Sequence, residues 1–168
     1  MSNRAFIVTG VSGCGKTTVS EALAKEIGAS FYDGDQFHPP GNIAKMSSGI
    51  PLTDEDREPF LKAINAFIKE KLPSENIVIA CSALKEKYRS ILSEGIDPSQ
   101  LIWIHLQGSF DVIYKRMTER KGHFMGADML RSQFETYEEP TKGIIVNINQ
   151  ELAQMIDQIK ADLKSYNN

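Results

Sequence analysis

The sequence is poor in cysteine and has no long apolar run. Its two cysteines, Cys14 and Cys81, lie far apart and in no metal-ligand spacing, which excludes a disulfide framework and a thiolate metal site. No stretch reaches the roughly 18 apolar residues of a membrane span. The apolar stretch that ends at Gly10 is too short for a signal peptide. These scarcities predict a reduced, soluble, cytoplasmic protein with no membrane partner.

The sequence also has no large excess of positive or negative charge. The chain has 19 Lys and Arg against 22 Asp and Glu, a net charge of -3, which argues against a nucleic-acid partner. Any anionic ligand must therefore be held by a local cluster of donors. The chain has 168 residues, of which 41% are hydrophobic, and it shows no linker, repeat or low-complexity segment. We expect a single domain over residues 1–168 and exclude a disordered chain, a collagen and a coiled coil.

Short apolar runs alternate with amphipathic segments along the chain. The runs predict strands of a parallel sheet buried on both faces, at residues 5–9, 31–32, 77–81, 101–106 and 144–148. Helices are predicted at residues 16–27, before Gly28, and after a capping box of Thr53 and Asp56. Two further apolar stripes predict helices: Phe110, Ile113 and Met117, then Leu152, Met155, Ile156, Ile159 and Leu163. The alternation predicts an α/β fold with an open, doubly wound sheet.

Two glycine-containing stretches, residues 36–51 and 121–128, fit this alternation less well, and we expect them to be irregular. In α/β proteins such insertions are where ligands bind and lids move. The sequence therefore predicts a substrate-side insertion over about residues 36–60 and a lid over about residues 121–139.

The segment after the first predicted strand is a complete GxxxxGK[ST] motif. Its glycines let the backbone curl so that N–H groups face phosphate oxygens, and the following helix directs its positive end at the same anion. Lys16 can reach the β and γ phosphates, and the Thr17 hydroxyl can bind Mg²⁺. The strand before the motif and the helix after it favour phosphate binding over a chance match. The predicted nucleotide-binding residues are Gly10, Val11, Ser12, Gly13, Cys14, Gly15, Lys16, Thr17 and Thr18.

Asp33 and Asp35 follow the second apolar run, at a strand end where doubly wound sheets bind ligands. One carboxylate there can hold Mg²⁺ through water while the other orients or deprotonates an attacking hydroxyl. The alternative is an Asp-Gly turn with solvated carboxylates. The position of the pair downstream of a phosphate loop favours the functional interpretation.

Basic side chains are candidates for neutralising charge during phosphoryl transfer. A mobile arginine in a lid can accelerate such transfer by roughly 10³–10⁵-fold, and Arg120 is the favoured candidate, ahead of Arg116. The alternative is a solvated helix face. The later insertion gathers five basic residues: Arg116, Arg120, Lys121, His123 and Arg131.

On the substrate side, Lys85 follows the third predicted strand and Arg57 lies in the first turn of a helix, where acidic residues are commoner. The alternative for each is a surface salt bridge. His38 and His123 can each hydrogen-bond a sugar hydroxyl, and an ordinary loop histidine is the alternative. The residues alone thus predict an ATP- or GTP-dependent phosphotransferase with a small, anionic acceptor.

The chain resembles the gluconokinase family in segments that together reach from about residue 6 to 148: GVSGCGKT, DGDQFHPPGNIAKMSSGIPLTDEDREPFL, CSALKEKYR, RKGHFM and LRSQFETYEEP. This resemblance implies the three-layer P-loop kinase fold, with a five-stranded parallel sheet between helices, a mobile lid and often a homodimer. It implies transfer of the γ-phosphoryl group of ATP to the 6-hydroxyl of D-gluconate, with Mg²⁺.

The resemblance also implies roles for single residues. Asp35 would face the acceptor hydroxyl and Asp33 the hydrated Mg²⁺, with Lys16 and Arg120 stabilising the transferring group. The gluconate side would be lined by Arg57, Lys85 and His38, and the lid would carry Arg120 and Lys121. Asn147 and Asn149 stand where the family often has Asp, so the adenine-side contacts are left open.

Two other functions compete with this prediction. Another small P-loop kinase, for shikimate, a nucleotide or a different sugar acid, would share every motif that the residues alone reveal. A regulatory nucleotide switch of the GTPase kind would need an Asn-Lys-x-Asp motif, which the chain lacks. The acidic run Asp54-Glu55-Asp56 does not support a helicase-like ATPase, because it opens a helix instead of ending an apolar strand.

Overall fold

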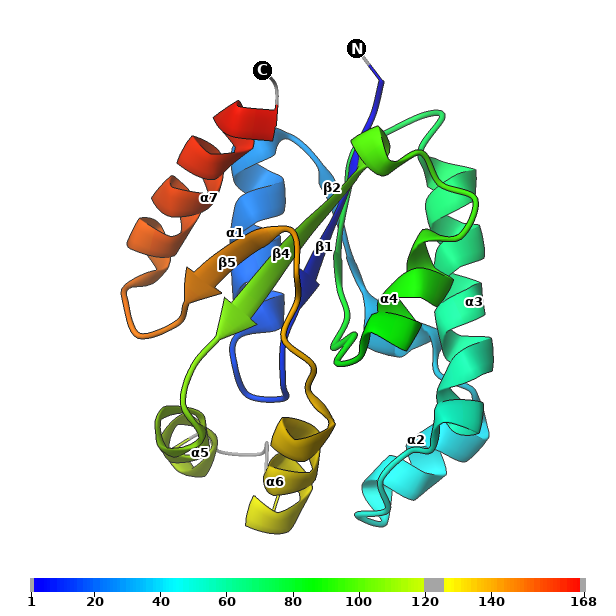
Figure 1. The fold of residues 1–168 in the computed structure, drawn as a ribbon, viewed down its shortest axis with the longest axis vertical. Helices are drawn as coiled ribbons and strands as arrows, with labels where there is room; N and C mark the ends of the chain where they lie inside the picture. Colours follow the sequence, from blue (N-terminus) through cyan, green and yellow to red (C-terminus); the bar gives the residue numbers. More distant parts are fainter. Residues whose placement is uncertain (1, 120–125, 167–168) are drawn as a thin grey trace.

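The computed structural model describes residues 2–119 and 126–166. Within these residues, five parallel strands form one sheet in the order β2-β3-β1-β4-β5 (Figure 1). The strands are β1 (Ala5–Thr9), β2 (Ser30–Asp33), β3 (Ile77–Ala80), β4 (Leu101–Gln107) and β5 (Ile144–Asn147). The helices are α1 (Lys16–Ile27), α2 (Pro40–Ser47), α3 (Asp54–Lys71), α4 (Glu86–Ser93), α5 (Phe110–Glu119), α6 (Ala127–Thr136) and α7 (Leu152–Tyr166), with 3₁₀ turns η1 (Gly34–Phe37) and η2 (Pro98–Gln100). The predicted α/β fold and five-stranded parallel sheet are confirmed.

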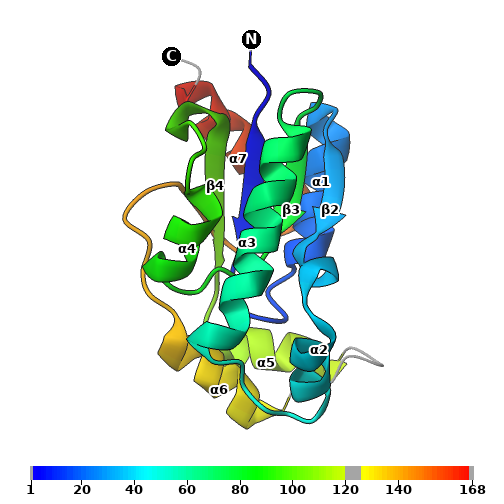
Figure 2. The same cartoon turned by 90° about the vertical axis from the view of Figure 1, so that its right-hand side faces the viewer.

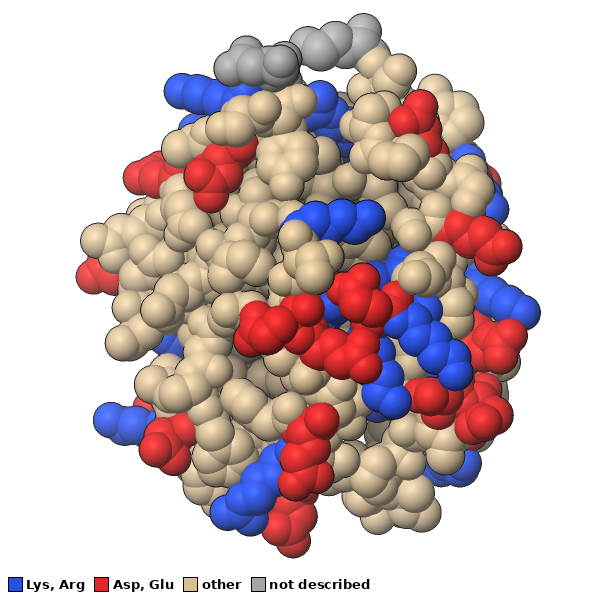
Figure 3. Space-filling model, in the orientation of Figure 1, with Lys and Arg blue, Asp and Glu red and all other residues tan. Residues whose placement is uncertain are grey.

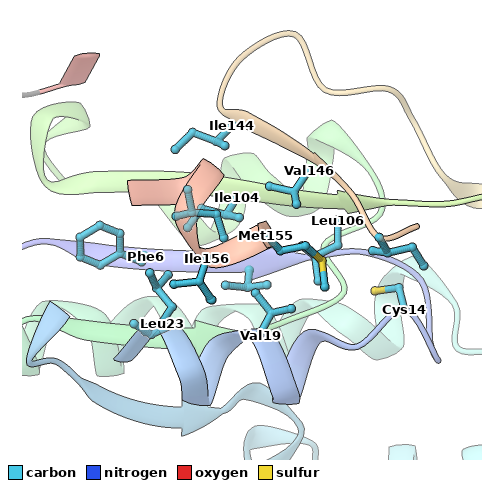
Figure 4. Close-up of a cluster of buried hydrophobic side chains, with 14 of the residues drawn as sticks. Phe6, Cys14, Val19, Leu23, Ile104, Leu106, Ile144, Val146, Met155 and Ile156 are labelled. Atoms are coloured by element: carbon cyan, nitrogen blue, oxygen red, sulfur yellow. The ribbon is translucent and has the colours of Figure 1, made fainter. Parts of the chain in front are cut away.

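Helices cover both faces of the sheet. Helices α1 and α7 lie on one face, and α3 and α4 lie on the other (Figures 1 and 2). Side chains of β1 alternate between the two layers, as the period of a strand requires: Phe6 and Val8 join the α1–α7 cluster, whereas Ala5 and Ile7 join the α3–α4 cluster. Figure 4 shows the first cluster, in which α1 meets α7 beneath the sheet through Val19, Leu23, Met155 and Ile156.

Local sequence signals account for many element boundaries. β1 has the predicted bounds, and β2 is longer at both ends than the predicted pair of residues. Helix α1 ends at Gly28, which adopts a left-handed conformation with φ of 70°. The capping box at the start of α3 is confirmed, because Thr53 Oγ1 accepts from Asp56 N at 3.1 Å and Asp56 Oδ2 accepts from Thr53 N at 2.9 Å.

Two sequence-based details are wrong. Residues 36–51 are not irregular throughout, because they contain the end of η1 and all of α2. Pro40 is the first residue of α2, where its fixed φ and missing N–H suit a helix. Leu152, predicted on the buried stripe of α7, is 37% exposed in the first turn, and the buried stripe starts at Met155. Within the predicted lid, the described residues 126–139 contain helix α6.

No helix within residues 2–119 and 126–166 is both long and apolar enough to cross a membrane. Acidic and basic side chains are interspersed over α3 and α4, on the right of Figure 3. Binding of an anion on this face therefore depends on the local arrangement of a few side chains.

Gly34 joins β2 to η1 where two backbones approach closely, and this gives a test of the fold. A Cβ at Gly34 would lie 2.4 Å from Ala80 O and 3.3 Å from Cys81 Cβ. We expect Gly34→Ala to push β2 away from β3 and lower the free energy of unfolding by about 1–3 kcal/mol, measured by urea denaturation. The matched control is Gly41→Ala, whose Cβ meets no atom within 4 Å. An equal loss in both variants would contradict the close approach at Gly34.

Candidate active site

The candidate active site is built around the glycine-rich loop between β1 and α1. Gly10, Gly13 and Gly15 have φ values of 145°, 81° and 95°, a region that L side chains rarely adopt. A Cβ at Gly10 would also lie 2.6 Å from Cys14 Sγ and 2.9 Å from Leu106 O, so the loop folds tightly against the end of β4. This curled backbone and the N-terminus of α1 form a cradle of N–H groups suited to phosphate.

Lys16, the first residue of α1, folds back over this loop. Its Nζ donates to Gly10 O at 3.0 Å and to Val11 O at 3.2 Å, which holds the ammonium group over the curled backbone. Thr17 and Thr18 follow in the first turn of α1, and both are exposed. A cation and a hydroxyl thus stand together at the entrance of the phosphate cradle.

Helix α6 contacts the phosphate loop directly. Gln133 Oε1 accepts from Ser12 N at 2.7 Å, and Gln133 Nε2 donates to Ser12 Oγ at 3.1 Å. Just beyond α6, the Tyr137 hydroxyl accepts from Gln107 Nε2 at 2.7 Å, at the end of β4. The described part of the predicted lid is therefore attached to the loop and to the sheet. Gln133 was not predicted as a site residue, although it lies in the LRSQFETYEEP segment, which carries part of the family resemblance.

The sheet brings Asp33 and Asp35 to the edge that carries the phosphate loop. Asp33 pairs with Ala80 and Ala80 pairs with Val8, so Asp33 lies two strand spacings, about 10 Å, from β1. Asp33 Oδ1 accepts from Asp35 N at 3.0 Å and thereby caps η1. The Asp35 side chain is 82% exposed, which leaves its carboxylate accessible to a ligand hydroxyl.

His38 lies beside Asp35, with His38 Nε2 at 3.8 Å from Asp35 Oδ1. The imidazole stacks on Phe60 at 3.7 Å between ring centroids, and its Nδ1 is 3.2 Å from Asn42 Nδ2. Burial lowers the pKa of His38 below its ordinary value of 6.5, and this outweighs the opposing effect of Asp35. The ring is therefore neutral at pH 7 and can offer a ligand a hydrogen bond without adding charge.

Arg57 and Lys85 come together around Tyr88. Arg57 Nη1 donates to the Tyr88 hydroxyl at 2.8 Å, and that hydroxyl donates to Asp54 Oδ1, which also accepts from Lys85 Nζ at 3.2 Å. The hydrogen bonds from Tyr88 and then Lys85 lower the pKa of Asp54 to about 2. Asp54 is thus an ionised partner of the predicted cations. Sequence analysis assigned no site role to Asp54 or Tyr88, although Tyr88 stands in the CSALKEKYR segment.

The phosphate loop, Asp35 and Lys85 follow the carboxyl ends of three neighbouring strands, β1, β2 and β3. Because these strands are parallel, the structure places all three segments at the same edge of the sheet. Cys81, just after β3, is buried there, and burial raises the pKa of its thiol to about 12. Arg120, Lys121 and His123, predicted for the lid, lie outside the described residues.

The remaining candidates lie toward β4 and β5. Arg116 Nη2 donates to Ile148 O at 2.7 Å and so braces the turn after β5. Asn147 lines a cavity of about 590 Å³ that extends to Val11 of the phosphate loop and to Ser109 after β4. This cavity borders the phosphate loop on its β4–β5 side, and neither Asp35 nor Arg57 lines it.

Arg89 holds the turn between β3 and α4 in place from within the protein. Its side chain is 5% exposed and donates to three backbone carbonyls, Ala83 O at 2.9 Å, Leu84 O at 3.2 Å and Glu138 O at 2.8 Å. Ala83 has φ of 42°, a strained value for a residue with a side chain. Arg89 therefore stabilises the turn that presents Lys85 and ties it to the segment after α6.

The fold and this site together define a small P-loop kinase. The shikimate kinase family profile matches residues 12–164. The thermoresistant gluconokinase of Escherichia coli (strain K12) is 45% identical over 90% of this chain and 88% of the relative. A gluconokinase crystal structure from Sinorhizobium meliloti 1021 is 44% identical over 96% of this chain and 92% of that chain, with a TM-score of 0.87. The shikimate kinase of Bacteroides thetaiotaomicron shares the fold at 15% identity and a TM-score of 0.67, over 96% of this chain and 98% of that chain. The chain belongs to the gluconokinases, within the shikimate kinase family.

The contacts of Arg89 predict a stability effect. Replacing it by Met removes the hydrogen bonds to Ala83 O and Glu138 O and one of the two to Leu84 O, which also accepts from Glu138 N, and we expect a loss of about 3 kcal/mol in the free energy of unfolding. For a chain of this size, that loss lowers the melting temperature by about 10 °C, measured by calorimetry. The control is Arg131→Met, since Arg131 is exposed and pairs with exposed Asp128. A similar shift in both variants would contradict the structural role of Arg89.

The ion pair of Asp56 and Lys45 predicts a pH dependence. The hydrogen bond from Lys45 is the first cause that lowers the pKa of Asp56 from 3.8 to about 2. A depressed carboxyl pKa contributes stability above its unfolded value and loses it as the pH falls through the folded value. We therefore expect Asp56→Asn to be less stable than the parent at pH 5, with the difference shrinking as the pH falls from about 4 through 2. Urea denaturation across this range measures it, and a difference of constant size from pH 5 to pH 2 would contradict the assignment.

Proposed function

We propose that this protein transfers the γ-phosphoryl group of ATP to the 6-hydroxyl of D-gluconate, giving 6-phosphogluconate and ADP. The observation that carries the proposal is that the phosphate loop after β1, Asp35 after β2 and Lys85 after β3 lie at one edge of the parallel sheet, with Lys85 joined to Arg57 through Asp54 and Tyr88. This arrangement supports transfer to a small acceptor with an anionic group. The acceptor itself is inferred from the 45% identity to a named gluconokinase.

The proposed mechanism uses in-line displacement at the γ-phosphorus. Asp35 orients the 6-hydroxyl and takes its proton while the hydroxyl oxygen bonds to phosphorus and the bond to the β–γ bridging oxygen breaks. Backbone N–H groups of the loop and Lys16 stabilise the negative charge on the phosphate oxygens. Arg57 and Lys85 hold the acceptor carboxylate, and neutral His38 hydrogen-bonds a hydroxyl of the sugar chain.

The donor set near the loop suits Mg²⁺. No group of three or more His, Cys, Asp or Glu within the described residues could enclose a metal ion, and the loop region offers the Thr17 hydroxyl and the Asp33 carboxylate. Mg²⁺ usually keeps several waters and binds one or two protein oxygens plus substrate phosphates. Thr17 would bind it directly and Asp33 through water, and the ion would neutralise phosphate charge. We assign Arg120 to the transferring group, and Lys121 and His123 to the acceptor.

We also propose a cytoplasmic homodimer, on the strength of the family resemblance. Sedimentation equilibrium of the purified protein distinguishes a dimer from the 18.8 kDa monomer.

The acceptor is the first test of this function. We expect ADP release from Mg-ATP to be stimulated strongly by D-gluconate, and far less by shikimate or a mixture of nucleoside monophosphates. The control lacks an acceptor. Stimulation by a different compound would keep the phosphate-loop assignment and overturn the choice of gluconate. Equal ADP release without any acceptor would overturn the kinase assignment.

The role of Asp35 gives a second test. We expect Asp35→Asn to reduce kcat by roughly 10²–10⁴-fold, because an amide cannot accept the proton, while KM for ATP changes by less than about twofold. Steady-state kinetics with both substrates varied measure the two constants. Near-normal turnover of a folded Asp35→Asn enzyme would show that Asp35 is not the base.

A further inference from the structure

Tyr88 contacts three charged side chains of the candidate site, Arg57, Lys85 and Asp54. Its hydroxyl accepts a hydrogen bond from Arg57 Nη1 at 2.8 Å and donates one to the Asp54 carboxylate. Its ring faces the same cations, with the Arg57 guanidinium carbon at 5.1 Å and Lys85 Nζ at 5.6 Å from the centroid. One side chain thus interacts with two cations and their counter-ion.

The position of Tyr88 is fixed by packing. The residue lies in α4 and is 2% exposed, and it belongs to the cluster of buried side chains shared by α3 and α4. The polar end of this buried ring emerges between the N-terminus of α3, which carries Asp54 and Arg57, and the residue before α4, which is Lys85. The hydroxyl is therefore a fixed point between two flexible cationic side chains.

The direction of the two hydrogen bonds explains why a tyrosine suits this place. Asp54 is ionised and draws the phenolic hydrogen toward itself, so the phenolic oxygen becomes a better acceptor for the Arg57 guanidinium. Phenylalanine would keep the ring and its cation–π contacts but would lose both hydrogen bonds. The hydroxyl, more than the ring, determines where the guanidinium points.

We propose that Tyr88 is a positioning residue that orients Arg57, and with it Lys85, for recognition of the acceptor's carboxylate. This inference deepens the proposed function and rests on it. Tyr88 acts through the two cations and takes no part in the transfer itself. Arg57 without this anchor would sample several rotamers, and ordering it on binding would weaken the acceptor complex.

The test compares Tyr88→Phe with a matched control, Tyr32→Phe. The substitution of Tyr32, in β2, also removes a hydrogen bond to a carboxylate, that of Glu75 at 2.7 Å. Neither Tyr32 nor Glu75 is among the candidate site residues. We expect Tyr88→Phe to raise KM for gluconate by about 10-fold, the effect of losing a hydrogen bond to a charged group, with kcat and KM for ATP within about threefold. Tyr32→Phe should leave all three constants within about twofold.

A second readout separates positioning from a merely structural role. Gluconamide replaces the acceptor's carboxylate by a neutral amide, so the ratio of its dissociation constant to that of gluconate measures how well the cations recognise charge. We expect calorimetry to show this ratio falling about 10-fold in Tyr88→Phe and staying unchanged in Tyr32→Phe. An unchanged ratio in Tyr88→Phe, or equal losses for ATP and both acceptors, would overturn the proposal.

The pathway through Arg57 is tested in a double-mutant cycle. If Tyr88 acts through Arg57, Tyr88→Phe should raise KM much less in an Arg57→Lys background than in the parent, whereas additive effects would overturn the proposal. Failure of the proposed function is seen separately, as absent turnover of the parent protein with gluconate. Should another anionic acceptor be turned over, the same cycle with that acceptor decides the role of Tyr88.

Discussion

In a parallel sheet the carboxyl ends of all strands lie along the same edge, and the candidate site depends on this constraint. β1 is the central strand, so the phosphate loop that follows it has β3 and β2 on one side and β4 and β5 on the other. The first side carries Asp33, Asp35 and the turn before Lys85. The second side carries the turn after β4, helix α6 and the cavity lined by Asn147. The strand order thus separates the proposed acceptor half from the proposed donor half, with the phosphate loop between them.

The proposed acceptor half must bind an anion although the protein as a whole is acidic. A protein with a net charge of -3 cannot attract an anion by its overall field, so it must concentrate cations locally. Arg57 and Lys85 are the cations that we propose for this role, and two adjacent cations repel each other in the absence of ligand. The ionised Asp54 offsets this repulsion, and the buried Tyr88 hydroxyl links it to Arg57. The cations are thereby kept together and oriented before any acceptor arrives, which reduces the ordering that binding requires.

Much of the fold was predictable because its signals are local. A run of apolar residues defines β1, Gly28 ends α1, and Thr53 with Asp56 starts α3. The phosphate loop was equally predictable, since its motif consists of residues adjacent in the chain. Helix α2 was missed because its proline-rich start resembles a loop, although proline is favourable in a first helical turn.

The contacts that complete the candidate site could not be predicted from the sequence in the same way. Asp54 and Tyr88 are 34 positions apart and meet only because α3 packs against α4. Gln133 is 121 positions from Ser12, and no local sequence pattern predicts the hydrogen bonds between them. The alternation of strands and helices located the strand ends, but which side chains pair across them depends on helix packing.

The segment around α6 joins the two halves of the site. Gln133 binds Ser12 in the phosphate loop. Five residues later Glu138 binds the turn between β3 and α4, with its N–H donating to Leu84 O at 2.7 Å and its carbonyl accepting from Arg89. A rotation of this segment would therefore move a donor-side contact and an acceptor-side contact together. Phosphoryl transfer needs both substrates aligned at once, and misplacement of either by about 1 Å is costly. A single packed segment that touches both sides is an economical way to keep that alignment, because one set of contacts defines both positions.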